Sequence, residues 1–209
     1  MKLRFSSAFL FSIALCSARA SAQSAVVAPP EPSLAARYSH ESRSILGGGA
    51  ITVVPSSSAS LGAQTSLYAD AQLRWMYRGW ALSPRVGVHG GFAEHNATLA
   101  GNLGADAGFY FGTIRPVSDR VSLGALAGYT FSLSYIGAPG GRGYQRGHAG
   151  SLEVPVTIHL GRAAFIEPVA VATYRVSTID VSSTAIAILG VGSTSSFVVS
   201  ASLRGGCVF

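Results

Sequence analysis

Apolar residues occupy every second position in successive runs from about residue 63 to the end of the chain, and this alternation constrains the fold most strongly. In residues 63–77, for example, Leu73 and Trp75 alternate with Gln72 and Arg74. A side-chain period of two belongs to extended strands that have one apolar and one polar face. Because the runs are about ten residues long or longer and turn residues separate them, they favour a transmembrane β-barrel.

The N-terminal segment has the three parts of a secretory signal peptide. Lys2 and Arg4 give a basic start, residues 8–15 form an apolar middle, and residues 20–22 are small. The apolar middle is far shorter than the roughly 20 residues that a membrane-spanning helix needs. We therefore expect residues 1–22 to be a cleaved signal peptide and the remaining chain to be exported.

The composition argues against several other classes of protein. Hydrophobic residues make up 48% of the chain, yet no apolar run after the signal peptide reaches the length of a spanning helix. A soluble β-sandwich would not expose so many Leu, Val and Phe side chains. The net charge of +6 includes three basic residues of the signal peptide, and the remainder does not indicate nucleic-acid binding. No residue spacing indicates a metal site, and we expect no cofactor.

Eight runs with this alternation predict eight strands. Residues 23–43 contain three prolines and lack periodicity, so we expect an irregular periplasmic lead-in there. The predicted strands cover residues 44–54, 63–77, 79–92, 98–112, 120–135, 147–161, 163–176 and 195–209. The predicted fold is all-β, an eight-stranded antiparallel up-and-down transmembrane barrel over residues 44–209. Closure into a barrel leaves no sheet edge without hydrogen-bond partners in lipid.

The connections between the predicted strands alternate in length, as in outer-membrane barrels. Short periplasmic turns are expected near residues 78–79, 113–119 and 161–162, and external loops near 55–62, 93–97, 136–146 and 177–194. Aromatic residues are expected to form two girdles at the membrane interfaces. The periplasmic girdle would hold Trp75, Tyr77, Trp80, Phe109, Phe111 and Phe209, and the outer girdle Phe92, Tyr129, Phe131, Tyr135, Tyr174 and Phe197.

With this pattern the chain resembles the small eight-stranded outer-membrane proteins of the OmpA-domain, OmpX and OmpW kind. Residues 197–209 end on an aromatic residue with apolar residues at alternate positions, which resembles the C-terminal signal read by the barrel-assembly machinery. Leu203, Cys207 and Phe209 are the candidate residues of that signal. The resemblance implies a monomer in the outer membrane of a Gram-negative bacterium, in contact with membrane lipid and lipopolysaccharide.

Charged residues fall on the polar faces of the predicted strands, which would line the lumen. They are four acids and four arginines: Asp70, Arg74, Arg85, Asp106, Glu153, Glu167, Arg175 and Arg204. Eight strands leave an interior just wide enough for side chains, and an unpaired charge there is costly. We therefore expect a salt-bridged plug, which His89 and His159 would join. The alternative is an ion path whose charges are only partly compensated.

Other polar residues raise two further possibilities. A hydrolase would need a histidine beside a serine and a carboxylate, but parity places His148 on the lipid side while Ser151 and Glu153 face inward. We therefore expect no enzyme. Arg142, Tyr144 and Arg146, in the third external loop, are candidates for contact with lipopolysaccharide or a partner, the alternative being a solvated loop.

The sequence therefore predicts a structural, envelope-stability or adhesion role through the external loops. A narrow, porin-like passive channel for ions or small apolar solutes, as in an OmpW-like protein, is the alternative. A lipid A-modifying enzyme is a third possibility. Fold alone does not choose among them, because function depends on the site.

Overall fold

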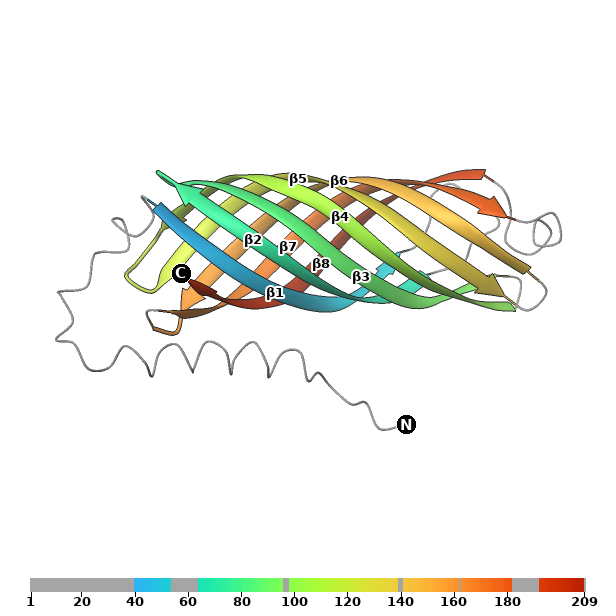
Figure 1. The fold of residues 1–209 in the computed structure, drawn as a ribbon, viewed down its shortest axis with the longest axis horizontal. Helices are drawn as coiled ribbons and strands as arrows, with labels where there is room; N and C mark the ends of the chain where they lie inside the picture. Colours follow the sequence, from blue (N-terminus) through green and yellow to red (C-terminus); the bar gives the residue numbers. More distant parts are fainter. Residues whose placement is uncertain are drawn as a thin grey trace, which may run out of the picture.

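The computed structural model describes residues 40–53, 64–95, 98–138, 141–161, 163–181 and 192–208. They form one closed barrel in which each strand pairs antiparallel with the next and β1 pairs with β8 (Figure 1). The strands are β1 His40–Val53, β2 Gln64–Tyr77, β3 Trp80–His95, β4 Thr98–Pro116, β5 Val121–Ala138, β6 Gly141–His159, β7 Ala164–Val181 and β8 Gly192–Val208. All eight predicted strands are present, and the predicted fold class is confirmed.

The two ends of the barrel differ in their connections. At one end β1 begins, β8 ends and the tight turns lie (Figure 1), and we call it the turn end. Arg78 and Gly79 join β2 to β3 there with positive φ angles of 49° and 82°, as in a two-residue type I′ hairpin. The opposite end we call the loop end. Of the predicted external loops, residues 55–62 and most of 177–194 lie outside the described residues.

Several strands extend farther toward the loop end than the sequence predicts. The third external loop, predicted over residues 136–146, is mostly strand, because β5 continues to Ala138 and β6 begins at Gly141. The alternation of faces continues through this region, with Ile136 buried and Tyr135 exposed. Glycine-rich composition suggested a loop, but glycine does not prevent ladder pairing between two strands that are already aligned.

The turn end also differs from the prediction. β1 begins at His40, inside the predicted lead-in of residues 23–43, and pairs with β2 from that residue onward. Glu41 and Arg43 are therefore part of the barrel, and both side chains are buried. The rest of the lead-in and the predicted signal peptide lie outside the described residues.

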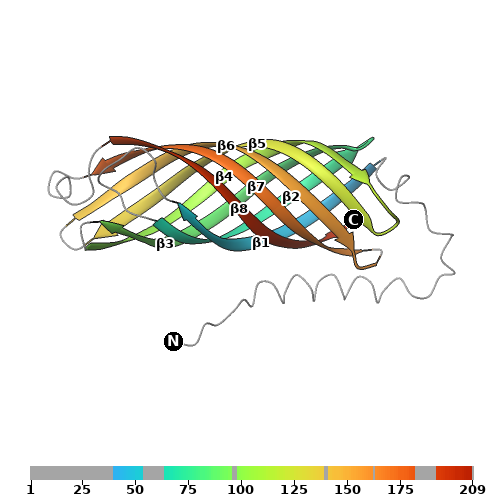
Figure 2. The ribbon, with the colours of Figure 1, turned by 180° about the vertical axis from the view of Figure 1, so that it is seen from behind.

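The outer surface is apolar and the interior is largely polar. Along β6, Leu152 and Val154 are 63% and 45% exposed, whereas Ser151 and Glu153 between them are buried. The same alternation runs around the barrel; Figure 1 shows β2 and β3 on its near side and Figure 2 shows β7 and β8. The described residues contain no helix long and apolar enough to cross a membrane.

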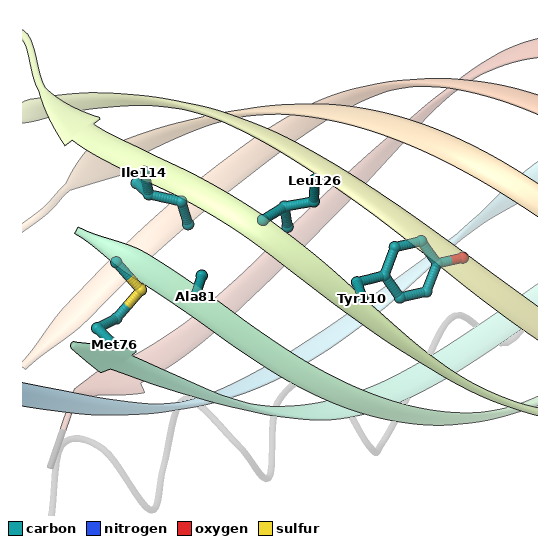
Figure 3. Close-up of a cluster of buried hydrophobic side chains, with 5 residues drawn as sticks. All are labelled: Met76, Ala81, Tyr110, Ile114 and Leu126. Carbon is teal, nitrogen blue, oxygen red and sulfur yellow. The ribbon is translucent and has the colours of Figure 1, made fainter. Parts of the chain in front are cut away.

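An apolar cluster interrupts the polar interior near the turn end (Figure 3). It consists of Met76, Ala81, Tyr110, Ile114 and Leu126, all at most 3% exposed. Met76 has the inward parity of Gln72 and Arg74, but its side chain is apolar. The Tyr110 ring lies against the backbone of Gly128, where a Cβ atom would collide with the ring. The lumen is therefore filled with side chains at this level.

One pair of exposed aromatic residues does not fit the division into two expected girdles. Phe109 and Tyr129, assigned to opposite girdles, are directly paired between β4 and β5, with ring centroids 6.3 Å apart. At the turn end, Trp80 stacks on Phe111 with centroids 5.2 Å apart. Period-two parity gives the face of a residue, but its height depends on strand register, which parity does not determine.

Replacing Ile114 by Ala should destabilise the barrel by about 2–5 kcal/mol, because it leaves a cavity among fully buried side chains. Val117→Ala is the control, since Val117 is 68% exposed at the neighbouring turn. Urea unfolding of the protein in detergent micelles measures both effects. Equal losses for the two variants would contradict the buried cluster.

Candidate functional site

The first layer of charged side chains lies near the turn end, where β1, β2, β6 and β7 meet inside the barrel. Arg74 donates two hydrogen bonds to Glu167, at 2.6 and 2.9 Å, and Thr157 donates a third at 2.7 Å. Arg43 donates to Glu41 at 2.6 Å, and its guanidinium lies 5.3 Å from the centre of the Phe165 ring. The Arg74, Glu167 and Arg43 side chains have no exposed surface.

A second layer lies farther along the lumen. Arg204 donates two hydrogen bonds to Glu153, at 2.7 and 2.8 Å, and Arg85 donates to the same carboxylate at 2.8 Å. Asp70 completes the group, 3.4 Å from Arg85 and 3.8 Å from Arg204. The Arg85 guanidinium also lies over the Tyr110 ring, 4.2 Å from its centre, and donates a hydrogen bond to the Tyr110 hydroxyl. This second layer thus contains two cations and two anions.

A third group lies toward the loop end on β3, β4 and β5. His89 Nδ1 is 2.8 Å from an Asp106 carboxylate oxygen, and His89 Nε2 is 2.8 Å from Ser134 Oγ. Arg175 lies 3.8 Å from the other Asp106 oxygen. A cavity of about 130 Å³ begins above the second layer, and its lining includes His89, Asp106 and Arg175.

The two lower layers and the apolar cluster place buried side chains across the lumen near the turn end. Placing a guanidinium inside a barrel removes it from water, and the cost is recovered only where a carboxylate and further hydrogen bonds surround it. Arg74 and Arg204 each have a bidentate carboxylate partner. The arrangement is suited to holding the strands in one register.

The structure brings the eight predicted lumen residues onto the inner side of the barrel, where they form two pairs and one group of four. Arg74 pairs with Glu167, and Asp106 lies beside Arg175. The remaining four, Asp70, Arg85, Glu153 and Arg204, form the second layer. His159, also predicted for the interior, is buried, with its ring centre 6.3 Å from that of Phe165.

Glu41, Arg43 and Tyr110 belong to the site as well, although the sequence did not predict them as lumen residues. The three prolines before residue 33 suggested an irregular segment, but Glu41, Arg43 and Ile45 already alternate with the parity of a strand. All three face inward and are buried. The alternation that begins at Glu41, before the predicted strand start at residue 44, could therefore have revealed the first two of these residues.

The histidine, serine and carboxylate considered for a hydrolase do not come together. His148 is on the outer face, hydrogen-bonded to Tyr129, whereas Ser151 is inside and lies 2.9 Å from Thr173. Glu153 is bound to arginines in the second layer. Among the residues that the structure describes, no group of three or more His, Cys, Asp or Glu side chains could hold a metal ion.

The candidate assembly signal lies on β8. Leu203 points outward and is 57% exposed, and Cys207 pairs with Ala164 of β7 and Ser44 of β1. Phe209 lies outside the described residues.

The candidate interaction residues lie on the outer face of β6 rather than in a loop. Arg142, Tyr144, Arg146 and His148 alternate along this face toward the loop end, and we call them the outer stripe. Tyr144 packs edge-on against Tyr135, with centroids 5.7 Å apart. Arg146 lies 3.1 Å from Asp180 in an exposed ion pair. The stripe therefore combines aromatic rings with positive charge that one carboxylate partly offsets.

Comparison with known proteins identifies the fold. No family model matches the sequence, and no curated protein matches it. The Yersinia pestis attachment invasion locus protein Ail, in complex with the heparin analogue sucrose octasulfate, matches over 81% of this chain and 99% of its own, with 13% identity and a TM-score of 0.50. A second Ail structure has a TM-score of 0.47 at the same identity and coverage.

Neisserial surface protein A is also similar, with 10% identity, a TM-score of 0.46 and coverage of 79% of this chain and 94% of its own. These proteins are small eight-stranded outer-membrane barrels. The expected resemblance to such barrels is confirmed at the level of the fold, which is what a similarity of 13% identity can show.

Breaking the Arg74–Glu167 pair should strongly lower the free energy of unfolding. Glu167→Ala leaves the Arg74 guanidinium buried without its carboxylate, and we expect a loss of about 3–5 kcal/mol in unfolding free energy. The double variant Arg74→Met with Glu167→Leu should recover most of that loss, because no buried charge remains. Urea titration of the refolded protein measures both.

Asp180→Ala is the matched control, because it removes the acid of an exposed pair and should cost less than about 1 kcal/mol. A Glu167→Ala variant as stable as Asp180→Ala would contradict the plug.

Proposed function

We propose that this protein is an outer-membrane barrel with a closed lumen, which stabilises the envelope or mediates interactions at the surface of a Gram-negative cell. The observation that carries the proposal is the buried, mutually paired set of arginines and carboxylates inside a barrel with an apolar exterior. An apolar exterior is stable in lipid and unfavourable in water. A filled interior leaves the outer surface and the loop end for function.

The dimensions of the strands support this location. A transmembrane strand needs about 9–11 residues, whereas β4 and β6 each have 19. Because the connections at the turn end are short, the surplus length lies at the loop end. With the turn end in the periplasm, where the short turns of outer-membrane barrels lie, the barrel projects above the outer leaflet.

The outer stripe supports contact with lipopolysaccharide. Arg142 and Arg146 lie on the lipid-facing side of β6, just beyond the apolar positions Leu152 and Val154. Lipopolysaccharide phosphates lie at the same boundary between acyl chains and polar headgroups. Aromatic side chains such as Tyr144 favour this boundary, and arginine there binds anionic headgroups.

The geometry gives less support to a passive channel or a lipid A-modifying enzyme. A passive channel needs a continuous polar path, and the paired arginines occupy that path. A lipid A-modifying enzyme needs a catalytic group on the outer face, and His148 there is bonded to Tyr129 rather than to a serine.

The full-length protein should show no steady unit conductance in a planar lipid bilayer, because two layers of buried ion pairs fill the lumen. Truncating both layers, with alanine at Arg74, Glu167, Glu153 and Arg204, should introduce conductance if the variant still inserts. A steady unit conductance of the unmodified protein that changes with Glu153→Gln would establish the channel instead.

Replacing Arg142 and Arg146 by Ala should weaken binding to purified lipopolysaccharide on the order of tenfold at low ionic strength, since each arginine near an anionic surface contributes about 1 kcal/mol. The mobility shift of the folded protein in native gels measures the affinity. Arg115→Ala with Arg120→Ala is the matched control, because both arginines are exposed at the turn end. Equal weakening by both pairs would show that only net charge matters.

A further inference from the structure

Two exposed arginines lie on the outer surface of the barrel at the turn end, against the β2–β3 hairpin. Arg78 belongs to the turn itself, and its guanidinium lies over the outward Tyr77 ring, 5.4 Å from the ring centre. Arg115 of β4 reaches the same turn: a Cβ atom at Gly79 would lie 2.6 Å from its Nη1 atom and 2.8 Å from its Cζ atom. Two guanidinium groups therefore lie against one hairpin.

The pairing of β3 with β4 holds Arg115 in this position. The Ile114 N–H donates a hydrogen bond of 2.9 Å to the Gly79 carbonyl, which fixes the end of β4 beside the turn. Arg115, the next residue, is exposed and has the outward parity of Phe111. Gly79 has no side chain, so the guanidinium can lie directly over the turn backbone. Contact with the turn restricts the Arg115 side chain, and a restricted side chain loses less entropy when it binds a ligand.

Aromatic side chains border the two arginines on the same outer face. Trp80 stacks on Phe111 with ring centroids 5.2 Å apart, and Tyr77 is the ladder partner of Trp80. All three rings are about half exposed on the lipid-facing side. Aromatic residues at the end of a transmembrane strand favour the boundary between acyl chains and headgroups. Arg78 and Arg115, which lie at the ends of β2 and β4, are therefore at headgroup level.

The positive charge of this surface has no acidic partner among the described residues. Neither Arg78 nor Arg115 takes part in a salt bridge with any residue that the structure describes. Asp119 and Arg120, in the connection between β4 and β5, are both exposed and offset each other in net charge. The hairpin thus presents two cations that are available to an anion.

We propose that Arg78 and Arg115 bind the phosphate of an anionic phospholipid in the periplasmic leaflet, with Tyr77 and Trp80 beside the glycerol and the first carbons of the acyl chains. Guanidinium groups donate paired N–H bonds to phosphate oxygens, and two of them surround one phosphate better than a single group does. The proposal rests on the proposed membrane location, with the turn end in the periplasm. It concerns the opposite end of the barrel from the outer stripe.

The charge of the site sets the class of lipid. Two cations without a carboxylate favour a headgroup that is negative overall, such as that of phosphatidylglycerol. Phosphatidylcholine has the same phosphate, but its quaternary ammonium group cancels the charge and would lie near the guanidiniums. The acyl chains distinguish a lipid from free phosphate, because Trp80 and Phe111 provide an apolar surface next to the cations.

Native mass spectrometry of the refolded full-length protein in detergent tests the site with phosphatidylglycerol and phosphatidylcholine of identical acyl chains. Phosphatidylglycerol should bind more tightly, and inorganic phosphate in excess should not displace it. Arg115→Ala should weaken phosphatidylglycerol binding about fivefold, as expected for one arginine at an anionic headgroup. Arg78→Ala combined with Arg115→Ala should weaken it about 25-fold.

Arg120→Ala is the matched control, because it removes one exposed positive charge at the same end of the barrel but outside the hairpin. This variant should bind phosphatidylglycerol like the unmodified protein. Equal weakening by Arg120→Ala and Arg115→Ala would overturn the proposal, since only net charge would then matter. Equal affinity for the two lipids, or displacement by inorganic phosphate, would overturn it as well.

These outcomes are distinguishable from a failure of the proposed function. None of them bears on the closed lumen, which the conductance measurement tests separately. Failure of the unmodified protein to fold in detergent, detected as the absence of a heat-modifiable gel shift, would contradict the membrane location and, with it, this site.

Discussion

Burial of guanidinium groups in a narrow lumen is the constraint on which the rest of this structure depends. An eight-stranded barrel has an interior that side chains just fill, so a long charged residue displaces water rather than sharing space with it. Arg74 and Arg204 are stable there because Glu167 and Glu153 meet them with two hydrogen bonds each. Each pair joins two strands that are not ladder neighbours, β2 with β7 and β6 with β8, and a shifted register would separate the partners at a high cost.

The two halves of the barrel along its axis differ in how their interiors are filled. The half near the turn end contains the apolar cluster and the two charged layers, and its interior is filled. The half near the loop end contains the cavity, the Asp106–His89–Ser134 chain and the outer stripe. The tightly packed half can hold the strands in place, so that the other half can keep a cavity and exposed charge without loss of the fold.

The fold could be predicted because one face of every strand is apolar, and a period of two assigns faces without any knowledge of contacts. The partners inside could not be predicted in the same way. Arg85 and Glu153 are 68 residues apart in sequence, and their pairing depends on the register of the strands between them. Parity does not determine that register. The Asp106–His89–Ser134 chain was missed for the same reason, whereas Glu41 and Arg43 were missed because nearby prolines outweighed a short alternating pattern.

Glycine explains how so many long side chains fit inside a barrel of fixed width. At Gly47 a Cβ atom would lie 2.5 Å from an Asp70 oxygen and 2.6 Å from Arg204 Cγ, so this position leaves room for the second charged layer. Gly104 does the same for His89 and Ser134. Gly47, the first glycine of the triplet in β1, is thus part of the lumen's packing. At Gly47 and Gly104, an inward glycine thus marks the place where polar side chains of neighbouring strands cross.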